Sequence, residues 1–173
     1  MASTLKNLSS YDENVVPSGK DFSIGIVVAD WNAHVTHKLY SACYETLIKH
    51  GVQESNILAS QVPGAFELPV AAKIMLNARP FDAIVCLGCV IKGETQHDEY
   101  INHAVAQGLI NLSIMSGKPI IFGVLTPNNE QQAVDRSGGL HGNKGDEAAI
   151  TALRMIDLQK QLKTQKSSIG FTS

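Results

Sequence analysis

A long apolar run lies near the middle of the chain, from Ala83 to Ile91, with only Gly88 interrupting it. A run of this length, rich in β-branched residues and bounded by turn residues, is typical of a strand buried on both faces in the middle of a parallel sheet. The run ends at Lys92 and Gly93, and a helical pattern begins near Asp98. The stretch therefore predicts a strand, a glycine-bearing loop and a helix start, and ligands bind at such loops in open α/β sheets.

Strands and helices alternate along the rest of the chain. Besides the central strand, the pattern predicts strands at 22–29, 56–62 and 119–125 and helices at 33–50, 68–77, 98–115, 130–136 and 144–163. This alternation predicts an α/β protein with a four-stranded parallel sheet and helices on both faces. Helical spacing predicts the buried faces of the first and last helices, namely Val35, Leu39, Cys43 and Leu47 in the first and Ala148, Thr151, Ala152, Met155 and Leu158 in the last.

Polar segments flank this pattern at both ends. The 173 residues suit a single domain. We expect an α/β domain at 22–165, a flexible N-terminal arm at 1–21 and a loose C-terminal tail at 166–173. The arm contains a short β-like segment at 14–16. This segment is either disordered or pairs with a neighbouring subunit, where it would cover an exposed sheet edge.

Composition and charge exclude several classes of function. A net charge of −2 without a basic stripe gives no reason to expect nucleic-acid binding. No apolar stretch approaches the roughly 18 residues that indicate a membrane span. The polar, acid-containing N-terminal segment does not resemble a secretory signal or a transit peptide, so we expect a cytoplasmic protein.

The chain contains three cysteines, Cys43, Cys86 and Cys89. An odd number argues against a disulfide framework. Cys86 and Cys89 form a C-x-x-C pattern, but they lie within the central strand, where residues three apart point to opposite faces. We therefore interpret them as buried small side chains rather than as a redox pair.

Unusual side chains follow each of the first three strands. Trp31, the only tryptophan, follows the first strand, Glu67 follows the second, and Thr95 and His97 follow the third. The carboxyl ends of parallel strands meet at one edge of a sheet, so these side chains should converge there. An aromatic face, a carboxylate, a hydroxyl and an imidazole suit a planar heterocycle that carries a polyol or a phosphate.

Each of these residues also has a purely structural interpretation. Trp31 could fill the core at a strand end, Glu67 could interact with a helix dipole, and His97 could be a surface or capping residue. His34 and His37 lie three residues apart at a helix start, but they lack a third metal ligand, so we predict a solvated helix face and no metal site.

Two common phosphate-binding motifs are absent from the sequence. The glycine-rich stretch 138–145 has Gly145 where a P-loop requires serine or threonine. No G-x-G-x-x-G pattern follows the first strand, which argues against a Rossmann dinucleotide site. The residues alone therefore indicate an α/β protein that binds a small polar heterocycle or a phosphorylated ligand.

Five motifs together are similar to those of one enzyme family. In chain order they are Trp31-Asn32, P-G-A-F-E-L-P at 63–69, G-C-V-I-K-G-E-T-Q-H at 88–97, P-I-I-F-G-V-L-T at 119–126 and G-N-K-G at 142–145. The set spans about Phe22 to Leu158 and closely resembles the lumazine synthase (6,7-dimethyl-8-ribityllumazine synthase) family of riboflavin biosynthesis. The resemblance implies a flavodoxin-like fold and a transferase that uses no metal and no organic cofactor.

The resemblance also implies the reaction and the roles of the matched residues. The family condenses 5-amino-6-(ribitylamino)uracil with 3,4-dihydroxy-2-butanone 4-phosphate to 6,7-dimethyl-8-ribityllumazine, and releases phosphate and water. His97 matches the histidine that transfers protons. The matched substrate-binding residues are Trp31 for ring stacking; Ala65, Phe66 and Glu67 for the ribityl chain and ring; Cys89, Val90 and Ile91 for the ring edge; Glu94 and Thr95 for the phosphate; and, from a neighbouring subunit, Phe122, Arg136 and Lys144, with Arg136 on the phosphate.

The chain departs from the family pattern directly after the matched histidine. The family usually has an aromatic residue and then an acid at this point, whereas Asp98 follows His97 here and Glu99 holds the acidic position. Asp98 either influences the protonation of His97 or caps the helix, and the sequence leaves both open.

Because the family's site is shared between adjacent subunits, the resemblance implies an assembly. The family forms homopentamers, and some members form sixty-subunit icosahedral shells. The stretch 136–144 has no insertion relative to the shell-forming members, which permits either state. The alternative to the enzyme is a non-catalytic flavin-binding or shell-forming protein of the same fold, in which Trp31 stacks on riboflavin.

Overall fold

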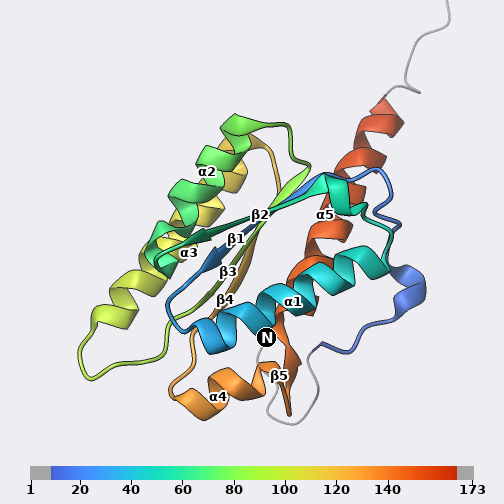
Figure 1. Ribbon diagram of the computed structural model, residues 1–173. Helices are drawn as coiled ribbons and strands as arrows, with labels where there is room; N and C mark the ends of the chain where they lie inside the picture. The colour runs from blue at the N-terminus through green and yellow to red at the C-terminus, as the bar shows by residue number, and fades with distance from the viewer. Residues whose placement is uncertain (1–8, 167–173) are drawn as a thin grey trace, which may run out of the picture.

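Four parallel strands form the central sheet, in the order β2-β1-β3-β4 (Figure 1). The description rests on a computed structural model that describes residues 9–166, with side chains described to residue 164. The order is that of the first four strands of a flavodoxin-like sheet, so the predicted fold class is confirmed. The strands are β1 (Ile24–Ala29), β2 (Ile57–Val62), β3 (Ala83–Cys89) and β4 (Ile120–Leu125).

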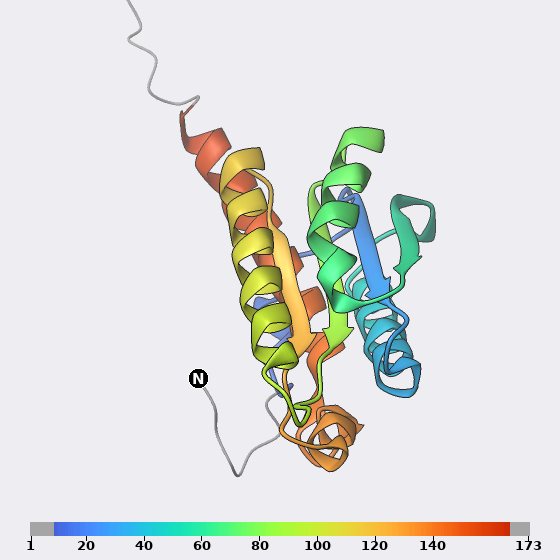
Figure 2. The same ribbon diagram turned by 90° about the vertical axis from the view of Figure 1, so that its left-hand side faces the viewer.

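Two helices cover each face of the sheet (Figure 2). Helices α1 and α5 pack on one face, and α2 and α3 pack on the other. Their bounds are α1 (Ala33–Lys49), α2 (Leu68–Ala78), α3 (His97–Ser116) and α5 (Lys144–Lys166). Alternate residues of β3 enter the two cores: Val85 and Leu87 face α1 and α5, whereas Ile84 and Cys86 face α2 and α3. Every residue of β3 is buried, as the apolar run predicted.

A short helix and a small hairpin connect β4 to α5. The hairpin was not predicted, because its strands are only two or three residues long and rich in glycine. Gly138 adopts a φ of 111°, a conformation that glycine reaches without a steric penalty. The elements are α4 (Glu130–Asp135), β5 (Ser137–Gly139) and β6 (Gly142–Asn143).

The part of the predicted arm that the structure describes lies against the domain. Tyr11 Oη is 3.2 Å from His50 Nε2, and Glu13 forms an ion pair with Lys49. Glu13–Val15 forms a 3-10 turn, η1, at the place where the sequence suggested a β-like segment. Residues 1–8 and 167–173 of the predicted arm and tail lie outside the described residues. The division at 21 and 165, and pairing with a neighbouring subunit, stay predictions.

The buried face of α5 differs from the predicted one. Ala148 and Ala152 are buried as expected, but Thr151, Met155 and Leu158 are exposed. The residues that fill the core instead are Ala149, Ile150, Leu153 and Ile156. Alanines occur on two sides of the first half of this helix, so periodicity alone did not distinguish the faces, and packing on α1 decides between them. The predicted stripe of α1 is fully buried.

Among residues 9–166, no helix is both long enough and apolar enough to cross a membrane.

The start of α5 approaches the backbone of α1 very closely at Gly145. A Cβ atom at this position would lie 2.0 Å from the carbonyl oxygen of Leu39. The Gly145 N–H donates to Asn143 Oδ1 at 2.8 Å, and Asn143 Nδ2 donates to the Lys38 carbonyl at 3.2 Å. These bonds tie the hairpin and the first turn of α5 to α1.

We expect Gly145→Ala to lower the free energy of unfolding by about 1–3 kcal/mol, because the added methyl group forces α5 away from α1. Thermal unfolding followed by circular dichroism measures the change. Gly93→Ala is the matched control, since a Cβ atom at Gly93 meets no heavy atom within 4 Å. Equal stability of the two variants would contradict this description of the contact between α1 and α5.

Candidate active site

A pocket of about 520 Å³ lies at the carboxyl edge of the sheet. From β1 the chain crosses to β2 on one side and then to β3 on the other, so the strand order reverses at β1. Such a reversal opens a crevice where α/β proteins bind ligands. Nine of the predicted site residues line this pocket, namely Trp31, Ala65, Phe66, Glu67, Cys89, Val90, Ile91, Thr95 and His97.

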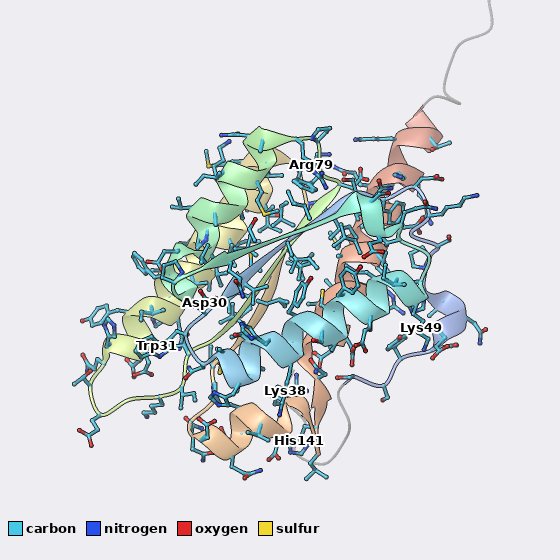
Figure 3. The ribbon with its side chains drawn as sticks, in the orientation of Figure 1. Asp30, Trp31, Lys38, Lys49, Arg79 and His141 are labelled. Atoms are coloured by element: carbon cyan, nitrogen blue, oxygen red, sulfur yellow. The ribbon has the colours of Figure 1, made fainter. Side chains whose placement is uncertain are left out.

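The exit of β1 presents Trp31 to the pocket. The residue is 73% exposed, so it does not fill the core, which was the structural alternative. Its backbone N–H donates to the Pro63 carbonyl at 3.0 Å. The next residue, Asn32, has a φ of 61° and donates from Nδ2 to the Cys89 carbonyl at 3.0 Å, which links the exits of β1 and β3. Figure 3 shows Trp31 between the end of β1 and the first turns of α3.

The exit of β2 folds into a short 3-10 turn, η3 (Ala65–Glu67), that leads directly into α2. A Cβ atom at Gly64 would lie 3.1 Å from Glu67 Oε2, so the glycine leaves room for this carboxylate. A Cβ atom at Gly88 of β3 would lie 3.4 Å from the Ala65 side chain, so the turn packs directly on the strand. Phe66 remains 58% exposed at the pocket.

The exit of β3 becomes the loop that ends at the start of α3. His97 is the first residue of α3, and its N–H lies 3.4 Å from Thr95 Oγ1. The Gly93 N–H donates to Asp98 Oδ1 at 3.4 Å. The N-cap residue of the helix is Gln96, so Asp98 does not cap it; its carboxylate ties the loop to the first turn of α3 instead. Thr95, His97 and Asp98 therefore line one side of the pocket together.

Cys89 lines the pocket, and Cys86 lies on the same strand outside it. Burial raises the pKa of Cys89 to about 12, and the negative charge of Glu130 adds to the effect, so the thiol is protonated at neutral pH. Burial also raises the pKa of Cys86. The two cysteines are free and lie in the two separate cores, as their spacing on a strand predicted. Besides Cys89, the titratable side chains that line the pocket are those of Glu67, His97 and Asp98.

His34 and His37, at the start of α1, each lie near an acidic side chain. His34 pairs with Glu130 of α4, and His37 Nε2 lies 4.0 Å from Asp30 Oδ1. Within residues 9–166, no group of three or more histidine, cysteine or acidic side chains could hold a metal ion.

Four of the predicted site residues do not line the pocket. Glu94 is exposed on the loop before α3, and Phe122 is 38% exposed on the edge strand β4. Arg136 and Lys144 flank the hairpin, and both bind the carboxylate of Glu147, at 2.8 Å and 3.0 Å. In Figure 3, His141 of this hairpin and Trp31 lie in different parts of the molecule. Within one chain, the structure therefore does not bring Arg136 and Lys144 to the pocket.

Sequence reasoning missed three residues that organise these regions. Asn32 was named only as part of the Trp31-Asn32 motif, although its side chain links the loops after β1 and β3. Glu147 was not singled out, although its position three residues after Lys144 on a helix is a known spacing for an ion pair. Asn143 was noted only within a motif, yet it is buried and binds the backbones of α1 and α5.

This fold and pocket define a flavodoxin-like α/β protein with a pocket at the switch point of its sheet, where proteins of this class bind ligands. Comparison with known sequences identifies the family. A sequence model of the 6,7-dimethyl-8-ribityllumazine synthase family matches residues 21–160. The chain therefore belongs to the 6,7-dimethyl-8-ribityllumazine synthase family, transferases of riboflavin biosynthesis.

Curated relatives support this assignment along nearly the whole chain. A 6,7-dimethyl-8-ribityllumazine synthase from Flavobacterium psychrophilum is 49% identical over 171 residues, which cover 99% of this chain and 88% of the relative. Another from Cytophaga hutchinsonii is 50% identical over 156 residues, which cover 90% of this chain and 98% of the relative. The resemblance inferred from the five motifs is confirmed, and the enzyme is favoured over the non-catalytic alternative.

Proposed function

We propose that the pocket at the carboxyl edge of the sheet is where this chain condenses 5-amino-6-(ribitylamino)uracil with 3,4-dihydroxy-2-butanone 4-phosphate. The products are 6,7-dimethyl-8-ribityllumazine, phosphate and water. The observation that carries the proposal is the placement of Trp31, a large aromatic side chain that is 73% exposed and lines a pocket with Glu67 and His97. An exposed aromatic face beside polar groups is suited to stacking on a heterocycle.

In this proposal the pyrimidine substrate lies between the exits of β1 and β3. Trp31 stacks on its ring, and the backbone groups of Cys89, Val90 and Ile91 meet the ring edge. Ala65, Phe66 and Glu67 contact the ring and the ribityl chain, where the Glu67 carboxylate accepts hydrogen bonds from hydroxyl groups. The support is that all seven residues line the same pocket.

The phosphate of the second substrate is assigned to the loop before α3. The first N–H groups of a helix are free to donate, and the helix dipole favours an anion at this end. Thr95 adds a hydroxyl group, and Glu94 adds its backbone N–H. His97, in the first turn of the same helix, is then close to both substrates and transfers protons during imine formation and ring closure.

Much of the rate acceleration comes from holding the two substrates together. Effective molarities of correctly oriented reactants reach about 10⁵ M or more. One general acid–base group typically accelerates a reaction by about 10²–10⁴-fold. No covalent enzyme intermediate is needed, which agrees with the protonated state of the buried thiols.

A neighbouring copy of the chain completes the site in this proposal. Phe122, Arg136 and Lys144 come from that copy, and Arg136 pairs with the phosphate. The support is that these residues lie outside the pocket of their own chain, and that the edge strand β2 is exposed along most of its length. We propose a homopentamer as the assembly, either alone or as part of an icosahedral shell. We propose the cytoplasm as the location, because the charge of its phosphate group keeps the phosphorylated substrate from crossing a membrane.

We expect the purified protein to convert the two substrates with coupled release of product and phosphate. Absorbance of the lumazine chromophore and a phosphate assay, recorded in parallel, measure the reaction. Omission of either substrate is the control. If neither signal appears, and the protein still binds riboflavin, the proposed activity is wrong for this chain.

A further inference from the structure

One carboxylate, that of Glu147, binds both cations that a neighbouring copy contributes to the site in the proposed function, Arg136 and Lys144. Nη2 of Arg136 donates to Glu147 Oε1 at 2.8 Å, and Nζ of Lys144 donates to Glu147 Oε2 at 3.0 Å. We propose that Glu147 is an internal counter-ion that competes with phosphate for these two cations and keeps phosphate binding weak enough for release. This inference rests on the proposed function, because it takes from it the pairing of Arg136 with the phosphate and the presence of Lys144 in the same site.

The geometry of the cluster supports competition rather than a simple surface ion pair. The side chains of Arg136, Glu147 and Lys144 are 18%, 22% and 28% exposed, so solvent screens their interaction less than that of a fully exposed pair. A longer contact also joins Oε1 of Glu147 to Ser9 Oγ, at 3.4 Å. Among the described residues, the shortest contacts of the carboxylate are therefore those with Arg136 and Lys144.

Arg136 is held in place independently of Glu147. Its Nη1 donates to the His141 carbonyl at 2.9 Å, within the hairpin between α4 and α5. A guanidinium group has five N–H donors, so Arg136 can keep the His141 contact while it exchanges Glu147 for a phosphate oxygen. Loss of the Glu147 charge should therefore leave Arg136 available rather than displaced.

The charge of the cluster explains why the carboxylate matters. Two cations and one carboxylate leave a single net positive charge, whereas a phosphate monoester carries about −1.5 to −2 at neutral pH. Without Glu147 the phosphate would meet two uncompensated cations. Phosphate is also a product of the reaction, and product release limits turnover in many enzymes, so tighter binding has a kinetic cost.

The test is Glu147→Gln in the assembled enzyme, because glutamine keeps an oxygen acceptor for Arg136 and removes the charge. We expect inorganic phosphate to inhibit the variant at about three- to tenfold lower concentration, the size of effect typical of one charge at a partly exposed site. KM for the phosphorylated substrate should fall, while KM for the pyrimidine stays unchanged. A side chain that only supports the fold would not tighten phosphate binding, and unchanged or weaker inhibition by phosphate would overturn the inference.

Asp146→Asn is the matched control, because it removes one negative charge from the adjacent residue. Asp146 accepts from Thr46 Oγ1 at 2.9 Å and forms no ion pair with Arg136 or Lys144. Phosphate inhibition of this variant should stay at the wild-type level. If both variants tighten phosphate binding equally, general electrostatics rather than competition at the cluster explains the effect, and the inference fails.

Two further variants keep the test decisive. If Glu147→Gln does not assemble, Glu147→Asp takes its place, because aspartate shortens the side chain and retains its charge. Phosphate should then bind this variant more tightly than wild type, by a smaller factor than the one expected for Glu147→Gln. Wild-type affinity in this variant would contradict the inference. Arg136→Gln should weaken phosphate inhibition. If it does not, the assignment of Arg136 to the phosphate is wrong. If phosphate inhibition weakens in Arg136→Gln but does not become tighter in Glu147→Gln, only the proposed role of Glu147 is refuted.

Discussion

Replacement of His97 by alanine is expected to lower turnover by about 10²–10⁴-fold, the range that one general acid–base group contributes. The residue lines the pocket with Glu67, and its backbone N–H lies 3.4 Å from Thr95 Oγ1 at the start of α3. The methyl group of alanine keeps the helix start but cannot transfer protons during imine formation and ring closure. Single-turnover absorbance of the lumazine product measures the loss, and size-exclusion chromatography confirms that the assembly survives.

His103→Ala provides the matched control for this prediction. His103 lies on the same helix, six residues further along, and its Nδ1 contacts the Glu99 carbonyl at 2.8 Å on an exposed surface. We expect the control variant to keep its turnover. Wild-type turnover in His97→Ala would show that proton transfer does not depend on this residue.

Replacement of Arg136 by alanine is expected to lower kcat/KM for the phosphorylated substrate by about 10²-fold, comparable to the loss of one donor that stabilises transition-state charge. A guanidinium group binds a phosphate through two parallel hydrogen bonds, which alanine cannot replace. Steady-state kinetics with each substrate varied in turn measure the effect. KM for the pyrimidine should change little, because the proposed function pairs Arg136 with the phosphate and not with the pyrimidine ring.

The control for Arg136→Ala is Arg154→Ala, which removes an exposed arginine from α5 and should leave both KM values unchanged. Equal increases in both KM values for Arg136→Ala would indicate a disturbed fold rather than a lost phosphate contact. Arg136 also holds the His141 carbonyl, so circular dichroism of the variant is needed to separate the two causes.

The central part of the fold could be predicted from the sequence because its signals are local and strong. The apolar run from Ala83 is long enough to identify a strand that is buried on both faces. Thr95 and His97 follow the carboxyl end of this strand, where ligands bind in open α/β sheets. Residues at the ends of three parallel strands must meet at one edge, so the convergence of Trp31 and Glu67 with them followed from topology alone.

The remaining features depend on contacts between distant parts of the chain, which periodicity does not encode. The buried face of α5 depends on how Gly145 approaches Leu39 of α1. The link between Asn32 and the Cys89 carbonyl joins two loops that are 57 positions apart in the sequence. Whether Trp31 packs inside or lies exposed is equally a question of packing, and the structural alternative for it was wrong.

The most direct test of a pocket shared between copies is to assemble His97→Ala and Arg136→Ala chains together. Each variant alone is impaired. A site formed between His97 of one chain and Arg136 of the next is complete when the first chain carries Arg136→Ala and the second carries His97→Ala. Random assembly from equal amounts in a closed ring should make about one site in four complete. Recovery to that fraction, absent when separately assembled variants are mixed, is the predicted result. No recovery at any ratio would place the whole site within one chain.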